Sequence, residues 1–591
     1  MDFCKTKLVK FYKVITALIF IQLLSGCAFT ADFLGEQYLL PNDNVRSAEY
    51  SVVTDHNIGF KTRDGIELVA DVHRPKGQMK TPTILIRIPF TKTFSNTFRS
   101  DIIGRYWARR GYTVVIQGTR GRYQSEGTFY PLIHERKDGI ETLKWLASQS
   151  WYNDQIVMWG GSAFGHTQWA IADQTAPGLD AFFIHIASTK FQNMFYPGNA
   201  FSLESAVYWA MRSRGEEDRE VDMNKLIASI DTLPTIDIDN VALGDTDFFN
   251  DWVTKQNDAY YWNIIDGHNR AQTVQAPVLL LAGWFDPFLP TQIEDFIQIK
   301  TQAKTKVAKE SRIIIGPWGH AVATELPNIG KVEPYRQASL AASLSWFDYQ
   351  LERFDGDALD MPPVKIYVMG INQWRDENEW PLMRTQYTPF YLHSASHANQ
   401  VVSNGRLDIE SPQMNEQTDT YIYDPLDPVP SMGGAMLGPR SGTYPQNIIE
   451  DRSDVLIYSS EPMERSMEVT GPVRAILYVS TDAVSTDFTV KLIDVHPNGN
   501  AYNLSDGIIR KNYNQPLDKP VEIEIELWPT SNVFLKDHKI RVEISSSNFP
   551  RYDRNLNTGK SNETSIETIP ANQIIFHSEK YPSRIILPII P

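Results

Sequence analysis

Cysteine is nearly absent from this chain: its 591 residues include only Cys4 and Cys27. Both lie in the N-terminal segment, so no disulfide is expected within a folded domain. A small disulfide-stapled scaffold is thereby excluded, and stability must come from packed hydrophobic cores. An apolar share of 42%, with 14 Trp, 26 Tyr and 28 Phe, is sufficient for such cores in the two to four domains expected at this length.

Basic residues are also fewer than acidic ones: the chain has 56 Lys and Arg against 71 Asp and Glu. The formal net charge is −15, and the sequence contains no basic run and no Cys/His spacing typical of a zinc site. An acidic surface disfavours nucleic acid as a partner, because phosphates bind to lysine and arginine side chains. We expect no nucleic-acid partner, no metal and no organic cofactor, and the sequence leaves the oligomeric state open.

The N-terminal apolar run, Val14–Leu24, is too short at about 11 residues to span a membrane comfortably. Four lysines precede it, as in a secretory signal peptide: Lys5, Lys7, Lys10 and Lys13. The run ends in Leu24-Ser25-Gly26-Cys27, which resembles a bacterial lipobox. This predicts a signal peptide over residues 1–26 and a diacylated Cys27 that anchors the protein in the bacterial cell envelope, on the periplasmic or outer-membrane side. The alternatives are an ordinary signal peptide and an uncleaved anchor with a chance cysteine.

After a tether over residues 27–48, short apolar runs alternate with stretches of helical periodicity. This alternation predicts a parallel sheet covered by helices on both faces. We assign this α/β core to residues 49–190 and 273–360. The expected strands are Thr83–Ile88, Thr113–Gln117, Gln155–Trp159, Phe182–Ile186, Val278–Ala282 and Arg312–Ile315.

Two segments depart from the alternation. Residues 191–272 are rich in aromatic side chains and carry a charged helical run, which favours a helical cap over the strand ends; a surface elaboration without a role in binding is the alternative. Residues 361–591 show short strand-like runs separated by turn residues, the first being Val364–Met369. Such spacing is typical of an all-β sandwich.

One strand leads directly into a glycine-rich turn. Gln155–Trp159 is followed by Gly160-Gly161-Ser162-Ala163-Phe164-Gly165 and then by a helix. This is the setting of a nucleophile elbow, in which a serine hydroxyl is exposed above a sheet. The usual pattern G-x-S-x-G requires glycine at position 164, where this chain has Phe164. A glycine-rich turn without a catalytic role is the alternative interpretation.

Serine needs a base to become a good nucleophile, and the base needs a carboxylate to orient it. Asp286 follows the strand Val278–Ala282, and His320 follows the strand Arg312–Ile315. Both positions are at carboxyl ends of strands, where open α/β sheets bind ligands. The order Ser162, Asp286, His320 is that of the α/β-hydrolases. His166 is a rival base close to Ser162 in sequence, but on the helix after the turn we expect it to point away.

Further segments of the chain resemble one group of α/β-hydrolases, the cocaine-esterase-like and X-Pro dipeptidyl-peptidase group. That group includes glutaryl-cephalosporin acylases and α-amino-acid ester hydrolases. The resemblance implies a hydrolase domain with a helical cap, a C-terminal jelly roll and catalysis on esters or amides. The matching segments are Arg63–Asp71, Arg87–Phe90, Arg120–Gly127, Gly160–Gly165, Gly283–Asp286, Gly316–His320, Met467–Pro472, Thr486–Leu492 and Ser546–Arg551.

The chain departs from this group at the oxyanion hole. In the proteins it resembles, the donors are a tyrosine hydroxyl and the backbone N–H after the nucleophile. Here Phe90 stands in the tyrosine position and has no hydroxyl, whereas Ala163 retains its N–H. Loss of one such donor typically lowers kcat by about 10²–10³. Arg120 and Arg122 are expected to hold loops by ion pairs rather than to bind a substrate carboxylate.

The residues directly after Asp286 narrow the substrate class. The amino-acid ester hydrolases resemble one another in carboxylates that bind a substrate ammonium there, whereas this chain has Pro287-Phe288-Leu289. An apolar acyl or alcohol group is therefore expected, unless the cap supplies acids such as Glu216, Glu217 or Asp218. We predict hydrolysis of a small-molecule ester or amide through an acyl-enzyme. Two alternatives are a dipeptidyl-peptidase or acylase, and a lipid-anchored binding protein on a degenerate hydrolase scaffold.

Overall fold

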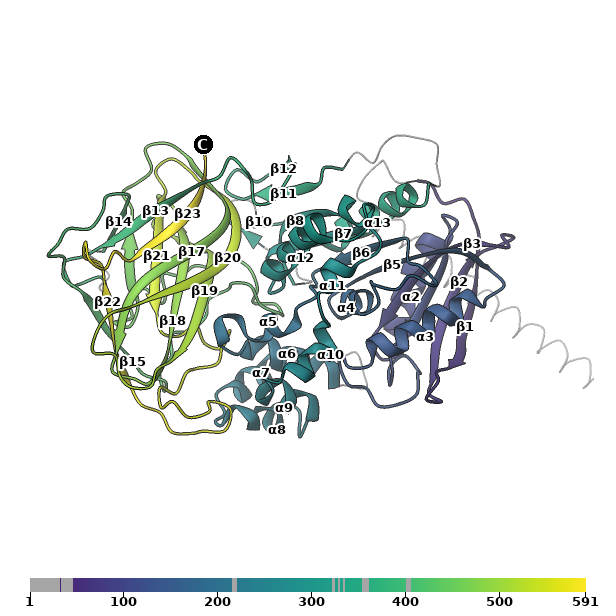
Figure 1. Cartoon of the computed structure of the whole chain (residues 1–591), viewed down its shortest axis with the longest axis horizontal. Helices are drawn as coiled ribbons and strands as arrows, with labels where there is room; N and C mark the ends of the chain where they lie inside the picture. Colours follow the sequence, from purple (N-terminus) through teal and green to yellow (C-terminus); the bar gives the residue numbers. More distant parts are fainter. Residues whose placement is uncertain are drawn as a thin grey trace, which may run out of the picture.

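The computed structural model describes Asp32 and residues 46–214, 221–320, 325–327, 330–332, 335–352, 361–399 and 405–591. Three parts lie next to one another in Figure 1: an α/β sheet with its helices on the right, a group of short helices below the centre, and an all-β domain on the left. No helix in the described ranges is long and apolar enough to cross a membrane.

Ten strands of the described residues form the α/β sheet, in the order β1-β2-β4-β3-β5-β6-β7-β8-β11-β12. Neighbours from β4 to β11 in this order run parallel, and antiparallel pairs occur only toward its two edges. The strands are β1 (Val52–Lys61), β2 (Glu67–Pro75), β3 (Thr81–Ile88), β4 (Thr113–Gly118), β5 (Tyr152–Gly161), β6 (Ala181–His185), β7 (Val278–Phe285), β8 (Arg312–Gly319), β11 (Val364–Val368) and β12 (Gln373–Glu377).

Successive apolar residues of the central strands enter two different cores, because side chains alternate across a sheet. Leu280 packs in the core beneath the helices of residues 135–147, 163–169 and 289–302, whereas Leu279 and Leu281 pack in the core beneath those of residues 94–108 and 335–350. This explains why the parallel strands are almost continuously apolar. The covering helices are α2 (Phe94–Ala108), α3 (Glu135–Ala147), α4 (Ala163–Trp169), α12 (Leu289–Gln302) and α13 (Tyr335–Gln350). A 3₁₀ turn, η3 (Ala308–Glu310), precedes β8. A short hairpin of β9 (Glu325–Leu326) and β10 (Gly330–Lys331) follows β8.

Between β6 and β7 the chain leaves the sheet and forms the cap, whose helices run from Phe191 to Thr273. The cap has its own aromatic core, in which Trp209 and Trp252 stack at a centroid distance of 4.7 Å. The cap elements are α5 (Phe191–Phe195), η1 (Pro197–Asn199), α6 (Leu203–Arg214), α7 (Met223–Ile230), η2 (Thr235–Asp237), α8 (Ile238–Ala242), α9 (Asp247–Thr254), α10 (Ala259–Asp266) and α11 (Arg270–Thr273).

The all-β domain is built around β17, which pairs with β20, β22 and β23. Its alternating apolar residues fill a core that is continuous with one core of the α/β sheet. The strands are β13 (Gln386–His393), β14 (Arg406–Asp408), β15 (Asp419–Tyr423), β16 (Leu456–Ser459), β17 (Met467–Thr481), β18 (Ser485–Val495), β19 (Ala501–Asn512), β20 (Val521–Phe534), β21 (Lys539–Ser545), β22 (Ala571–Phe576) and β23 (Arg584–Ile590).

One strand assignment from the sequence is wrong. We expected Val364–Met369 to open the β-sandwich, but β11 (Val364–Val368) pairs parallel with β8 and extends the α/β sheet, with β12 beside it. A strand of the α/β sheet and a strand of the β-sandwich would both bury this apolar run, so its composition does not show to which sheet it belongs. The backbone partner decides, and Ile366 lies in register with Ile315 of β8.

Candidate active site

Ser162 lies at the sharp turn between β5 and α4. Its backbone has φ 55° and ψ −128°, a combination that non-glycine residues rarely adopt. The Ser162 N–H donates a hydrogen bond to the carbonyl oxygen of His185 at 3.0 Å, which ties the turn to the end of β6. The strained turn and the helix after it present the hydroxyl at the carboxyl edge of the sheet.

The glycines around Ser162 are required by close packing. A Cβ atom on Gly161 would lie 2.3 Å from Nδ1 of His185, and one on Gly165 would lie 2.5 Å from Cβ of Ala187. A Cβ atom on Gly160 would lie 2.5 Å from Cβ of Phe164. Phe164 is the departure from the pattern G-x-S-x-G. It fits because Gly160 has no side chain, so the space beside Gly160 is free for the Cβ of Phe164.

Ser162, His320 and Asp286 form one hydrogen-bonded series. Nε2 of His320 lies 3.0 Å from Oγ of Ser162, and Nδ1 of His320 lies 2.6 Å from Oδ2 of Asp286. The Asp286 side chain is fully buried, and that of His320 is 11% exposed. The three residues directly follow β5, β7 and β8, and the fold thus brings together the three residues singled out from the sequence.

Asp286 is held from two sides. Its Oδ1 accepts a hydrogen bond from the N–H of Phe288 at 2.8 Å. The indole N–H of Trp528, on β20 of the β domain, donates to the main-chain oxygen of Asp286 at 3.0 Å. The β domain thus contacts the site directly. Sequence reasoning missed Trp528, because no motif links a strand so late in the chain to a residue of the α/β domain.

The oxyanion side of the site contains aromatic rings. The Phe90 ring meets Phe164 edge-on at a centroid distance of 5.3 Å. Arg212 of α6 in the cap lies over the same Phe90 ring, with its guanidinium 5.6 Å from the ring centroid. Ala163 is the first residue of α4, so its N–H has no intrahelical acceptor and is available to an oxyanion.

Aromatic rings of the α/β core and of the cap form a wall next to His320. Phe288 lies 5.8 Å from the His320 ring, and Phe191 of α5 lies 4.9 Å from Phe288. Trp209 of α6 continues the wall at 6.2 Å from Phe191. Phe288 was expected from the sequence to make this region apolar. Phe191, Trp209 and Arg212 were not identified, since nothing in the sequence shows which helical face of an insertion turns toward the site.

The other candidate residues lie elsewhere or have structural partners. The His166 side chain is buried with its ring 4.9 Å from Phe191, and burial lowers its pKa well below the ordinary value. His166 bonds Ser162 through its backbone N–H, at the main-chain oxygen, and the imidazole at the Ser162 hydroxyl is that of His320. Arg120 bridges Asp64 and Asp138 at 2.8 and 2.7 Å, an ion-paired structural role.

Arg122 binds the main-chain oxygen of Ser213 and lies over the Phe129 ring, so it links the cap to the α/β core. Glu216, Glu217 and Asp218, considered as cap acids, lie outside the described residues, as does Cys27.

A serine, an imidazole and a carboxylate in hydrogen-bonded series at the ends of parallel strands define the serine-hydrolase class of α/β-hydrolases. Comparison with family models narrows this class. The X-Pro dipeptidyl-peptidase (S15 family) matches residues 64–322, and the X-Pro dipeptidyl-peptidase C-terminal non-catalytic domain matches residues 357–586. The second match includes β11 and β12, which pair with the α/β sheet.

The chain is 37% identical over 584 residues to a cocaine esterase of Rhodococcus sp. (strain MB1 Bresler), covering 92% of this chain and 99% of that protein. Two solved structures share the fold: an aminopeptidase of a marine sediment Thaumarchaeota archaeon (TM-score 0.75, 23% identity, 93% and 99% of the two chains) and an α-amino acid ester hydrolase (TM-score 0.74, 20% identity, 93% and 98%). The chain belongs to the X-Pro dipeptidyl-peptidase (S15) and cocaine-esterase family, and it is a serine hydrolase acting on ester or amide bonds.

Proposed function

We propose that this protein hydrolyses small-molecule esters through an acyl-enzyme on Ser162. His320 takes the proton of the Ser162 hydroxyl as Oγ attacks the ester carbonyl, and it returns that proton to the departing alcohol. Water, deprotonated by the same imidazole, then attacks the acyl-enzyme and releases the acid. The observation that supports this most directly is the series of 3.0 and 2.6 Å contacts from Ser162 through His320 to Asp286.

Asp286 and Ala163 have supporting roles in this proposal. The buried Asp286 carboxylate keeps the proton of neutral His320 on Nδ1 and stabilises the imidazolium that forms during attack. The Ala163 N–H, at the positive end of α4, donates to the oxygen of the tetrahedral intermediate. No metal or organic cofactor is needed for these steps.

We infer an uncharged or apolar group next to the scissile bond. Phe288 packs against His320, Phe191 packs against Phe288, and the cation over the Phe90 ring is Arg212. A substrate ammonium would be repelled by this guanidinium, and Pro287, Phe288 and Leu289, directly after Asp286, offer it no carboxylate.

The test of the nucleophile is fluorophosphonate labelling of the protein lacking residues 1–27, with the adduct located by mass spectrometry. We expect one adduct on Ser162, which disappears in a folded His320→Ala variant. The His268→Ala variant, at an exposed position, is the matched control and should label like the unmodified protein. A folded protein without an adduct would favour a binding protein on a hydrolase scaffold.

The substrate class is tested with matched compounds. An aryl ester, its anilide and the α-amino derivative of the ester differ in one group each. We expect kcat/KM to be highest for the unsubstituted ester. A higher value for the anilide would indicate an acylase or peptidase, and a higher value for the amino ester would contradict the inferred substrate class.

We also propose that Cys27 is lipidated and anchors the protein in the cell envelope. The support is the Leu24-Ser25-Gly26-Cys27 pattern after the run Val14–Leu24. Expression in a bacterium should place the full chain in the membrane fraction with a diacylglycerol mass on the Cys27 peptide, and Cys27→Ser should release it or leave the leader uncleaved. Cleavage at another residue without a lipid would contradict the anchor.

A further inference from the structure

A second cluster of ligand-type side chains lies in the β domain, on elements that the active site does not use. Asp494 is in β18, and His496 comes just after the end of that strand, so the two side chains share one face. His538 precedes β21, which pairs with β18; it lies opposite His496, one step beyond the pair Val495 and Lys539. Sheet pairing therefore brings two imidazoles to one carboxylate.

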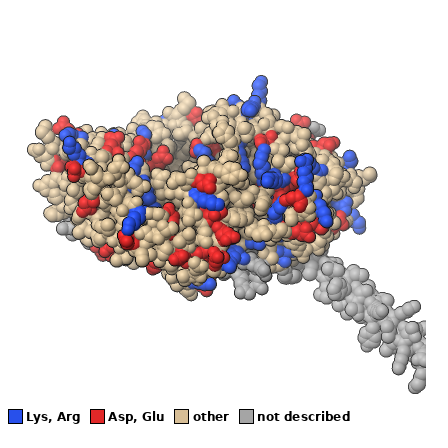
Figure 2. Space-filling view, turned by 60° about the horizontal axis from the view of Figure 1, so that its bottom comes forward, with Lys and Arg blue, Asp and Glu red and all other residues tan. Residues whose placement is uncertain are grey.

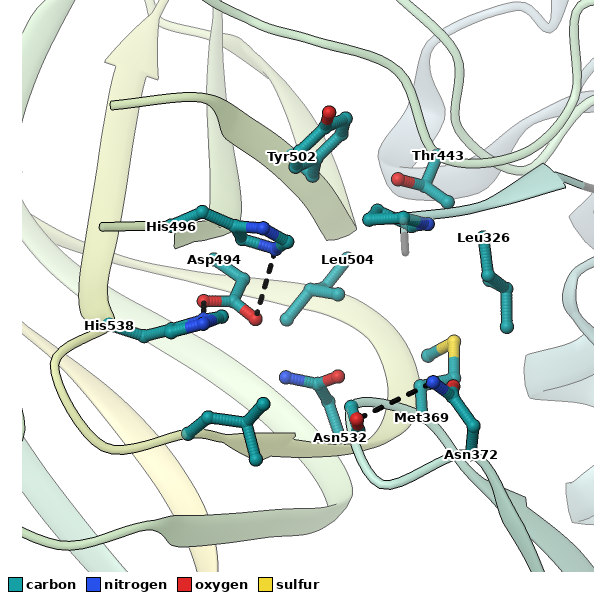
Figure 3. A pocket seen from close by; sticks show the side chains of 13 residues that line it. Leu326, Met369, Asn372, Thr443, Asp494, His496, Tyr502, Leu504, Asn532 and His538 are labelled. Atoms are coloured by element: carbon teal, nitrogen blue, oxygen red, sulfur yellow. Dashed lines mark hydrogen bonds and ion pairs between the residues drawn. The ribbon is translucent and has the colours of Figure 1, made fainter. Parts of the chain in front are cut away.

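The three side chains converge closely. Nδ1 of His538 lies 2.8 Å from Oδ1 of Asp494, and Nε2 of His496 lies 3.9 Å from Oδ2 of the same carboxylate. One ligand atom from each residue can be chosen so that all three lie within 4.8 Å of one another. Figure 3 shows both rings directed at the Asp494 carboxylate. All three residues are buried, their side chains being at most 9% exposed.

These separations suit a divalent cation. With Zn–N and Zn–O bonds of about 2.0–2.2 Å, ligands of a tetrahedral zinc ion stand roughly 3.4 Å apart, and the two observed separations lie on either side of this value. The 3.9 Å contact is too long for a hydrogen bond. The His496 ring packs 4.9 Å from Tyr502 and 4.4 Å from His538, and these contacts do not satisfy its Nε2. A cation between the three ligands would satisfy it.

The cluster also opens into a small cavity of about 40 Å³. This is enough space for roughly one to three water molecules, which a three-ligand metal requires to complete its coordination. The cavity lies at the junction of the two domains, because its wall includes Leu326 of β9 and Met369 and Asn372 of the β11–β12 hairpin (Figure 3). Polar side chains of Thr443 and Asn532 are positioned to bind such waters.

We propose that Asp494, His496 and His538 form a divalent transition-metal site that prefers Zn²⁺. The ion replaces the proton shared by His538 and Asp494, takes Nε2 of His496 as its third protein ligand and keeps water on the cavity side. Bound there, it joins the β18–β19 hairpin to β21 at the edge of the α/β domain. The site is a structural staple, and it is independent of the proposed chemistry at Ser162.

The test uses the protein lacking residues 1–27, treated with EDTA and then titrated with Zn²⁺ in a calorimeter. We expect one ion per chain, and the thermal midpoint Tm should rise as the site fills. Co²⁺ should give the d–d absorption of a nitrogen- and oxygen-ligated ion. His496→Ala removes one ligand but leaves the bond between Asp494 and His538, and it should weaken Zn²⁺ binding by at least about 100-fold, since loss of even an outer-shell partner costs about 10–100-fold.

The His397→Ala variant, at an exposed position, is the matched control and should bind Zn²⁺ like the unmodified protein. Asp494→Asn is the second ligand variant; if it does not fold, His496→Ala alone decides. Equal Zn²⁺ affinity in the His496→Ala and unmodified proteins would overturn the proposal, as would the absence of Zn²⁺ binding to the folded, EDTA-treated protein. Fluorophosphonate labelling of Ser162 should be the same with and without the ion.

Discussion

At the scale of single residues, Phe90 is the main difference between this site and those of the proteins that the chain resembles. The proteins that the chain resembles place a tyrosine hydroxyl there, whereas here the ring packs on Phe164 and beneath Arg212. The Ala163 N–H remains as the donor assigned to the oxyanion. With one donor instead of two, the transition state is stabilised less, and the reaction should be slow for a serine hydrolase.

Adding a hydroxyl at position 90 should restore part of this stabilisation. We predict that Phe90→Tyr raises kcat for an aryl ester by about 10–100-fold, somewhat less than the loss that accompanies removal of an optimised donor. Steady-state kinetics would measure it, with KM changing little because the donor acts on the transition state. Phe90→Leu keeps an apolar side chain without a hydroxyl and should give no gain. An equal gain in both variants would mean that the added hydroxyl is not its cause and would contradict the missing donor as the limit on the rate.

At the scale of elements, two carboxylates, one buried and one half-buried, hold the segment through which the chain leaves β6 for the cap. Asp295 of α12 accepts hydrogen bonds from the N–H and hydroxyl of Thr189 at 2.8 and 2.6 Å. Asp266, at the end of α10, accepts one from the N–H of Phe191 at 2.7 Å. Burial raises the pKa of each carboxyl to about 7.

These raised pKa values predict a pH-dependent stability. The folded protein keeps protons on Asp266 and Asp295 between about pH 4 and 7, where an unfolded aspartate with a pKa near 4 has lost its proton. The contribution of these groups to the free energy of unfolding therefore falls as pH rises through that window and is constant above it. In Asp295→Asn, the decline of Tm from about pH 4 to pH 7 should be shallower than in the unmodified protein. Exposed Asp518→Asn should leave the slope unchanged, and an unchanged slope in Asp295→Asn would contradict the assignment.

The elements differ in how far the sequence reveals them. Ser162, Asp286 and His320 could be found because each follows a short apolar strand and their order fits one fold, which is local information. The strand β11 was assigned to the wrong sheet because its buried pattern suits both sheets and only pairing with β8 decides. Asp494 and His538 come together through the pairing of β18 with β21, so no local spacing indicated a metal site.

At the scale of the whole molecule, the cap is tied to the β domain as well as to the sheet. Arg440 of the β domain pairs with Glu204 of α6, with Nε 2.8 Å from Oε1, and Asp553 accepts a hydrogen bond from the N–H of Phe201 at 2.8 Å. On the face shown in Figure 2, acidic and basic side chains are interspersed and form no extended basic area. The pair of Arg440 and Glu204 is a specific charge pair between two parts of the molecule.

Breaking one of these ties should destabilise the protein. In Arg440→Gln, the Glu204 carboxylate, whose side chain is 2% exposed, loses its cation. We predict a loss of about 1–3 kcal/mol in the free energy of unfolding, below the range for fully buried pairs because Arg440 is partly exposed. Urea denaturation would measure it. The double variant Glu204→Gln/Arg440→Gln removes the unpaired charge and should recover part of the loss; no recovery would mean that packing, and not charge, accounts for it.

The β domain also acts on the triad, through the hydrogen bond from the Trp528 indole to the main-chain oxygen of Asp286. Trp528→Phe keeps an aromatic ring but removes the N–H, which leaves the main-chain oxygen of Asp286 with only the longer hydrogen bond from the N–H of Leu289 at 3.2 Å. If this bond fixes Asp286 and thereby the orientation of His320, its loss should lower kcat by about 3–10-fold, the equivalent of roughly 1 kcal/mol, with KM nearly unchanged. Fluorophosphonate labelling of Ser162 should slow by a similar factor.

The Tyr387→Phe variant, at an exposed position of β13, controls for removal of a polar aromatic group from the β domain. A folded Trp528→Phe variant with a lower Tm but unchanged kcat would show that the β domain only stabilises the hydrolase domain, whereas the predicted loss of kcat would make it part of the machinery that positions the triad.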